Sequence, residues 1–148
     1  MNILADTCFW ISLCDPSEKD HIEVVAMMEI ILEDGRYKVL VPHPVFYETL
    51  CSGMVKKPDQ VLTLTKFFER VEKVPDSDYF EEAYRLIERQ ASNNKGNASM
   101  VDIAIMLVAN DLKNNVKALL TKNGRDFGSF CQKKGIPMIV NKAVLDSV

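Results

Sequence analysis

The amino-acid sequence predicts a three-layer α/β/α sandwich with a mostly parallel central sheet. The chain opens on a short apolar run, Ile3 to Ala5, without the alternation typical of a strand that has one solvated face. Similar short runs at 38–42, 117–121 and 136–140 are separated by segments whose apolar residues recur at helical spacing. Strands that alternate with helices favour a parallel sheet covered on both faces.

The chain can be divided into elements in order. Ser17 is suited to cap the second helix and Gly35 to end it, and Pro44 suits the first turn of the third. The stretch 92–97 is the clearest loop. The pattern predicts strands over 2–5, 38–42, 71–74, 117–121 and 136–140, and helices over 8–14, 18–34, 44–51, 59–68, 76–91, 99–112 and 127–133.

Length and composition indicate a single domain over residues 1–148. With 47% hydrophobic residues, the chain can bury a core without disulfides. Its 18 basic and 21 acidic residues give a net charge of −3, which argues against a broad basic surface for nonspecific nucleic-acid binding. The four cysteines form no C-x-x-C pair, so we expect reduced thiols, mostly in the core. No secretion signal or membrane span is apparent, and we expect a soluble, cytoplasmic protein with no membrane partner.

Four carboxylates stand where a polar side chain is conspicuous. Asp6 follows the first strand, and Asp126 follows the loop after the penultimate strand. Glu48 lies in the helix after the second strand, and Asp102 lies near the start of an apolar helix. Ligands of open α/β sheets bind at the carboxyl ends of strands, which predicts that these acids converge.

Each acid also has a purely structural interpretation. Asp6 and Asp126 fit as caps of the helices that follow them, and Glu48 fits a solvated helix face. Asp102 fits a capping box together with Ser99. These interpretations compete with a shared site.

An acidic cluster at one sheet edge predicts a divalent cation. Neighbouring carboxylates raise one another's pKa unless a cation lies between them. Oxygen ligands without a set of His or Cys side chains favour Mg²⁺ or Mn²⁺ over zinc. A site of this kind suits phosphoryl transfer, because the metal lowers the pKa of a bound water and stabilises the leaving oxygen.

Four segments carry the acids: ILADT at the amino terminus, VPHPVFYETL after the second strand, SMVDIAIMLVA at a helix start and LLTKNGRDF after a late strand. Together they resemble the PIN-domain ribonucleases, including the VapC-type toxins, over nearly the whole chain. The resemblance implies the strand order 3-2-1-4-5, with the first strand in the middle. It also implies that the catalytic, metal-binding acids are Asp6, Glu48, Asp102 and Asp126.

The resemblance further implies a shell of supporting side chains. These are Thr7, Ser99, Thr121 and Asn123. Two positions depart from the family pattern. Cys8 stands where a small polar residue is more frequent, and Asn123 is neutral where many members have an Asp, which bears on a second metal ion and not on the first.

Basic side chains border the expected site and point to RNA as the substrate. Lys122 and Arg125 precede Asp126, and Lys95 precedes Ser99, so these side chains are suited to hold backbone phosphates. Ordinary solvation is the alternative. The resemblance to the PIN-domain ribonucleases implies an endoribonuclease that cuts single-stranded RNA, and with it we expect a homodimer and a small antitoxin protein as partner.

Other classes of protein share parts of this pattern. A catalytically silent PIN-like module that binds RNA or protein is the alternative function. A receiver domain needs paired acids after the first strand, and a haloacid-dehalogenase phosphatase needs an Asp where Cys8 stands. A nucleotide-triphosphate enzyme would need a glycine-rich phosphate loop, and the sequence has none.

Overall fold

The computed structural model describes residues 1–53, 57–93 and 98–148 and contains a five-stranded sheet. All its strand pairings are parallel, in the order β3-β2-β1-β4-β5. This confirms the predicted fold class and strand order. The strands are β1 (Asn2–Ala5), β2 (Lys38–Pro42), β3 (Glu72–Val74), β4 (Val116–Leu120) and β5 (Met138–Ile139).

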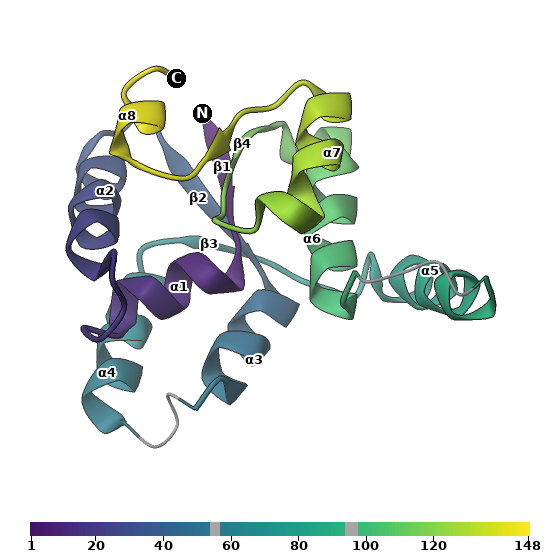
Figure 1. The fold of residues 1–148 in the computed structure, drawn as a ribbon, viewed down its shortest axis with the longest axis horizontal. Helices are drawn as coiled ribbons and strands as arrows, with labels where there is room; N and C mark the ends of the chain where they lie inside the picture. Colours follow the sequence, from purple (N-terminus) through teal and green to yellow (C-terminus); the bar gives the residue numbers. More distant parts are fainter. Residues whose placement is uncertain (54–56, 94–97) are drawn as a thin grey trace.

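Helices connect the strands and cover both faces of the sheet (Figure 1). They are α1 (Thr7–Cys14), α2 (His21–Glu33), α3 (His43–Cys51), α4 (Pro58–Phe68), α5 (Phe80–Ser92), α6 (Met100–Asn110), α7 (Gly124–Lys134) and α8 (Lys142–Leu145), with a 3-10 turn, η2, at Leu112–Asn114. In Figure 1, α1, α2 and α4 lie to one side of the strands and α6 and α7 to the other, while α5 projects from the body. None of the helices described is long and apolar enough to cross a membrane.

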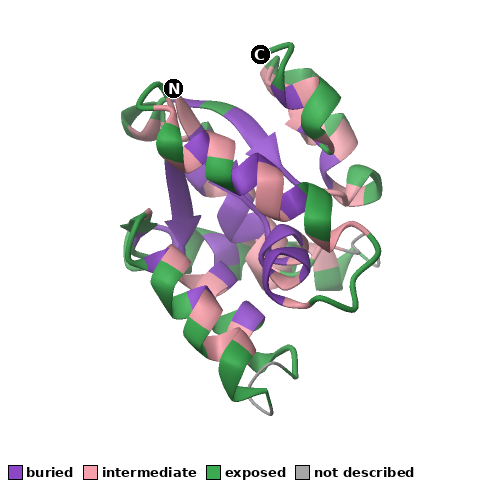
Figure 2. Ribbon diagram, turned by 90° about the vertical axis from the view of Figure 1, so that its left-hand side faces the viewer, coloured by how far each residue is buried: buried purple, intermediate pink, exposed green. Residues whose placement is uncertain are grey.

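The central strand β1 is buried on all sides. Ile3, Leu4 and Ala5 expose none of their surface, because β2 and β4 flank the strand and helices cover both faces, as the purple strands in Figure 2 show. The Asp6 N–H continues the ladder one residue further by donating to the Leu120 carbonyl oxygen at 2.9 Å. Asp6 is therefore fixed at the carboxyl edge of the sheet.

The second helix begins later than the sequence predicts. It starts at His21 rather than at residue 18, and Ser17 does not cap it. The Ser17 N–H and hydroxyl instead both donate to Oδ1 of Asp15, at 3.0 and 2.7 Å. The short-range turn satisfies these polar groups, so the backbone becomes helical only after it.

The start of α7 and the end of the chain also differ from prediction. Helix α7 begins at Gly124 instead of residue 127, because the Asn123 side chain accepts the N–H of Asp126 and caps the helix. Asp126 consequently lies inside the first turn. The short helix α8, capped by Asn141, was not predicted from the sequence pattern.

All four cysteines are free thiols, as the sequence predicts. Only Cys14 and Cys131 are buried in the core, whereas Cys8 is half-buried and Cys51 is exposed. The expectation that most thiols lie in the core therefore holds for two of the four.

Candidate active site

A cleft of about 580 Å³ lies at the carboxyl edge of the sheet and is lined by all four predicted acids. The strands β1, β2 and β4 are parallel, so the segments that follow them meet at one edge, where the start of α6 joins them. The acids in the lining are Asp6, Glu48, Asp102 and Asp126. The polar residues beside them are Thr7, Cys8, Cys51, Ser52, Ser99, Asn123 and Arg125.

Asp6 is 4% exposed, and both of its carboxylate oxygens accept hydrogen bonds. Oδ1 accepts the N–H of Thr7 at 2.6 Å, so Asp6 does cap α1. Oδ2 accepts the Thr121 hydroxyl at 2.7 Å and the Cys8 thiol at 3.0 Å. Thr121 is fully buried and accepts the Asn123 N–H at 3.0 Å, which orders the loop between β4 and α7.

Glu48 lies on the exposed side of α3. Its carboxylate lines the cleft and accepts one hydrogen bond there. The Thr7 hydroxyl donates to its Oε2. Thr7 thus links two acids, because its backbone N–H binds Asp6 and its side chain binds Glu48. The solvated helix face and the convergent site, which the sequence left as alternatives, are both present.

Asp102 forms the predicted capping box with Ser99. Its Oδ2 accepts the Ser99 N–H at 2.8 Å, and its own N–H donates to the Ser99 hydroxyl oxygen at 3.1 Å. The capping box places the Asp102 carboxylate at the amino terminus of α6, where the helix dipole favours negative charge. Capping and lining the cleft are therefore compatible.

The Asp126 carboxylate accepts hydrogen bonds from a guanidinium and from a side-chain amide. Arg125 donates from Nε to Oδ1 at 3.0 Å, and Asn123 donates from Nδ2 to Oδ2 at 2.7 Å. These bonds, led by the Arg125 guanidinium, lower the pKa of Asp126 below its usual value. The mutual rise in pKa expected from clustered carboxylates is therefore not seen at this residue.

No group of three or more His, Cys, Asp or Glu side chains in the described ranges is arranged to hold a metal ion. Protein donors occupy the four carboxylates instead. The donor chemistry suits a hard cation, because four carboxylates border one open cleft. A carboxylate has lone pairs enough to keep its hydrogen bond while it binds a cation, so cation binding would require the side chains to draw together rather than to lose these bonds.

The three basic residues predicted to contact RNA differ in their surroundings. Arg125 lines the cleft, and 83% of its side chain is exposed. Lys122 is directed along α1, where its ammonium pairs with Asp20 and donates to the Ser12 hydroxyl. Lys95 lies outside the described residues.

Cys8 contributes polar contacts that the sequence reasoning did not anticipate. Burial and then the neighbouring Asp6 carboxylate raise the pKa of its thiol to about 11. The thiol is therefore protonated at neutral pH. The available signal was its position two residues after Asp6, in the first turn of the helix that Asp6 caps.

Comparison with solved structures places this fold beside VapC toxins. VapC20 from Mycobacterium tuberculosis, a sarcin-ricin loop cleaving toxin, matches with a TM-score of 0.64 and 18% identity, over 86% of this chain and 94% of that chain. A chain from the structure of VapBC2 from Rickettsia felis, bound to a DNA fragment from the VapBC2 promoter, matches with the same TM-score and identity. The match covers 93% of this chain and 97% of that chain. No family model and no curated protein matches the sequence.

The class is thus an α/β/α domain with an acidic cleft at the carboxyl edge of a parallel sheet. Its fold is the PIN-like fold of the VapC toxins. The resemblance noted in the sequence is confirmed at the level of the fold.

Thr121→Val tests the buried hydroxyl that joins Asp6 to the loop after β4. The variant keeps the shape but leaves the Asn123 N–H without its acceptor, and we expect a loss of about 1–3 kcal/mol in the free energy of unfolding. Urea unfolding in the presence of EDTA measures this change in the free energy of unfolding. The control is Thr65→Val on the exposed face of α4, expected to stay within about 0.5 kcal/mol. Equal losses in both variants would contradict the assignment.

Proposed function

We propose that this protein is a metal-dependent endoribonuclease that cleaves single-stranded RNA with a metal-activated water. The observation that carries the proposal is the convergence of Asp6, Glu48, Asp102 and Asp126 on one cleft. The fold gives independent support, since VapC20, which has the same fold, is described as a sarcin-ricin loop cleaving toxin.

The four acids would hold Mg²⁺ or Mn²⁺, and the bound cation would supply a water of lowered pKa as nucleophile. Neutral donors orient these carboxylates: Thr121 for Asp6, Thr7 for Glu48, Ser99 for Asp102 and Asn123 for Asp126. Each donor comes from backbone or a short side chain, so it fixes direction at little entropic cost. Asn123, a neutral residue, adds no charge for a second cation.

Arg125 is the side chain best placed to meet a backbone phosphate. Its guanidinium is mostly exposed at the cleft and can pair bidentately with phosphate oxygens. Lys122 could reach RNA only by leaving Asp20, and Lys95 stays a prediction from the sequence. The substrate contact is therefore proposed as local, at the margin of the acids.

The biological setting we propose is a toxin paired with a small antitoxin protein. The fold that this chain shares with VapBC2 supports this setting.

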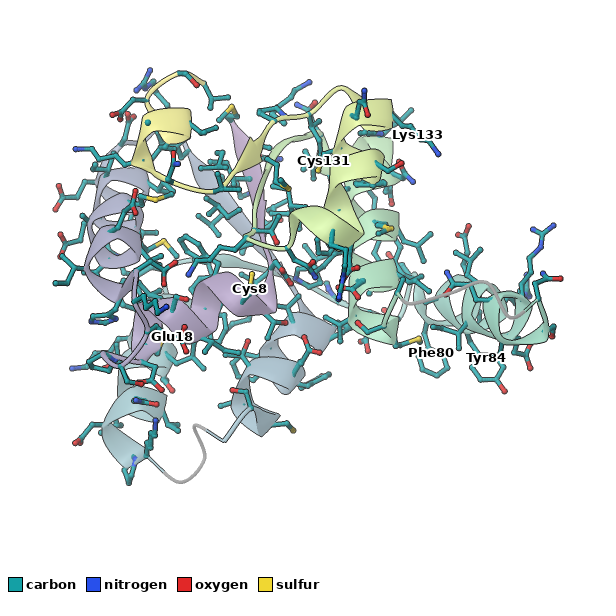
Figure 3. The ribbon with its side chains drawn as sticks, in the orientation of Figure 1. Cys8, Glu18, Phe80, Tyr84, Cys131 and Lys133 are labelled. Carbon is teal, nitrogen blue, oxygen red and sulfur yellow. The ribbon has the colours of Figure 1, made fainter. Side chains whose placement is uncertain are left out.

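A homodimer stays a prediction. Exposed aromatic side chains on α3 and α5, namely Tyr47, Phe80 and Tyr84, are available for it, and Phe80 and Tyr84 lie along one side of α5 in Figure 3. A catalytically silent module is the alternative, and the presence of all four acids argues against it.

Incubation with single-stranded RNA tests the proposal directly. We expect cleavage with Mg²⁺ or Mn²⁺, none with EDTA, and products with a 5′-phosphate and a 3′-hydroxyl, because a metal-bound water attacks the phosphorus. Asp6→Asn should abolish cleavage, while Asp59→Asn, at the start of α4 and outside the cleft, should not. Cleavage that persists in EDTA, or cyclic phosphate ends, would rule out this mechanism.

Asp102→Asn separates the capping box from the metal site. As a cap alone, Asp102 contributes about 0.5–1 kcal/mol whether or not metal is present. As a ligand, it also mediates stabilisation of the parent by Mg²⁺, roughly 2.7 kcal/mol at a hundredfold excess over Kd. We expect thermal melts to show that Mg²⁺ stabilises the parent and Asp59→Asn, but Asp102→Asn far less. An equal Mg²⁺ response in all three would leave Asp102 as a cap.

Arg125→Ala tests the proposed phosphate contact. Binding of single-stranded RNA should weaken, and the slope of log K against log salt should flatten by about 0.7 for each phosphate that is no longer neutralised. Lys122→Ala is the comparison: a similar decrease in slope would show that its ammonium leaves Asp20 for RNA. Fluorescence titrations at several salt concentrations, in EDTA to prevent turnover, give both slopes. An unchanged slope for Arg125→Ala would leave it as a solvent-facing charge.

A further inference from the structure

Cys8 is a half-buried thiol beside the four acids of the cleft. It lies in the first turn of α1, half-buried, and lines the acidic cleft. In Figure 3 its sulfur lies on the side of α1 that faces the start of α7. Within the described residues, the other cysteines have no side-chain hydrogen-bond partner, so Cys8 alone combines a thiol with polar contacts.

The contacts of Cys8 join two separate segments. Its Sγ lies 3.0 Å from Oδ2 of Asp6 and 3.6 Å from Oγ1 of Thr121. The backbone N–H of Lys122 donates to the same sulfur at 3.4 Å. One side chain thus contacts both Asp6, which follows β1, and the loop that follows β4.

The direction of each hydrogen bond follows from the donors available. Lys122 N–H can only donate, so the sulfur is its acceptor, and the thiol hydrogen is free for Asp6. The Thr121 hydroxyl likewise donates to Asp6 and accepts from Asn123. Asp6 Oδ2 therefore receives two hydrogen bonds, one from a helix residue and one from a loop residue.

This arrangement couples two of the proposed metal ligands. Asn123, at the far end of the same loop, donates to Asp126 at 2.7 Å. A continuous path of hydrogen bonds and backbone thus runs from Asp6 through Cys8 and the loop to Asp126. A shift of the loop would change the separation of the two carboxylates.

We propose that Cys8 is a positioning residue, whose thiol locks Asp6 and the loop of residues 121–123 into one unit and so sets the spacing of Asp6 and Asp126 for the cation. The inference rests on the proposed function. Cys8 is not itself a ligand here, because its hydrogen is directed to Asp6. The thiol replaces the small polar side chain more frequent in the family by acting as donor and acceptor together.

The test measures Mn²⁺ affinity by calorimetry in the full chain and three variants. Cys8→Ala removes the hydrogen bonds of the thiol with Asp6 and Lys122 and should weaken Mn²⁺ binding about tenfold, the lower end of the range for residues that orient metal ligands. Cys8→Ser keeps a donor and an acceptor and should stay within about threefold of the parent. Cys14→Ala, a buried thiol without polar partners on the same helix, should leave the affinity unchanged.

A second measurement, made without metal, reports on the contact between Cys8 and the loop of residues 121–123. Amide hydrogen exchange in EDTA should be several-fold faster at Lys122 in Cys8→Ala than in the parent, and restored in Cys8→Ser. Cys14→Ala should leave that amide unchanged. Exchange at this one amide separates the loss of the Cys8–Lys122 hydrogen bond from a general loss of stability.

Defined outcomes would overturn the inference. Parent-like Mn²⁺ binding by Cys8→Ala, or equal weakening in the Ala and Ser variants, would exclude positioning by hydrogen bonds. A sulfur-to-metal charge-transfer band with Co²⁺, lost in Cys8→Ser, would make Cys8 a ligand instead. If the parent binds no Mn²⁺ at all, the proposed function fails and the inference with it, whereas the first three results refute the inference alone.

Discussion

Burial of β1 between two parallel neighbours is the constraint on which the site depends. A strand without exposed backbone must pair all its N–H and C=O groups, so its register against β4 is fixed. Ala5 lies opposite Leu120, and the next residue on each strand is polar: Asp6 on one and Thr121 on the other. Their hydrogen bond is thus a direct consequence of sheet register, with Asp6 lining the cleft and Thr121 buried beside it.

Helix starts explain how several acids can share one cleft. Asp6 caps α1, Asp102 belongs to the capping box of α6, and Asp126 lies in the first turn of α7. Each helix amino terminus carries a partial positive charge that stabilises a nearby carboxylate by about 0.3–1 kcal/mol. Arg125 adds a further positive charge beside one of these acids, Asp126. Structural capping is therefore the means by which the fold gathers potential metal ligands.

The sequence predicted those features that local pattern or strand topology determines. The buried run at β1, the capping box at Ser99 and the convergence of the acids all follow from residue type and the geometry of parallel sheets. Contacts between distant segments could not be read in this way. Lys122 has its partner in Asp20, far away in the sequence, and that pairing depends on how α1 packs against the loop after β4. The Asp15 turn that delays α2 depended on a competition between local hydrogen bonds that periodicity does not register.

Charge balance bears on how the proposed ribonuclease would select its substrate. The cleft gathers four carboxylates and one arginine, and the whole chain has a net charge of −3. A divalent cation offsets only part of that negative potential, and Lys122 is already paired with Asp20. A long strand of RNA would therefore gain little from nonspecific attraction. Under the proposed function, binding would therefore have to come from a few contacts near the scissile phosphate and from the shape of the RNA.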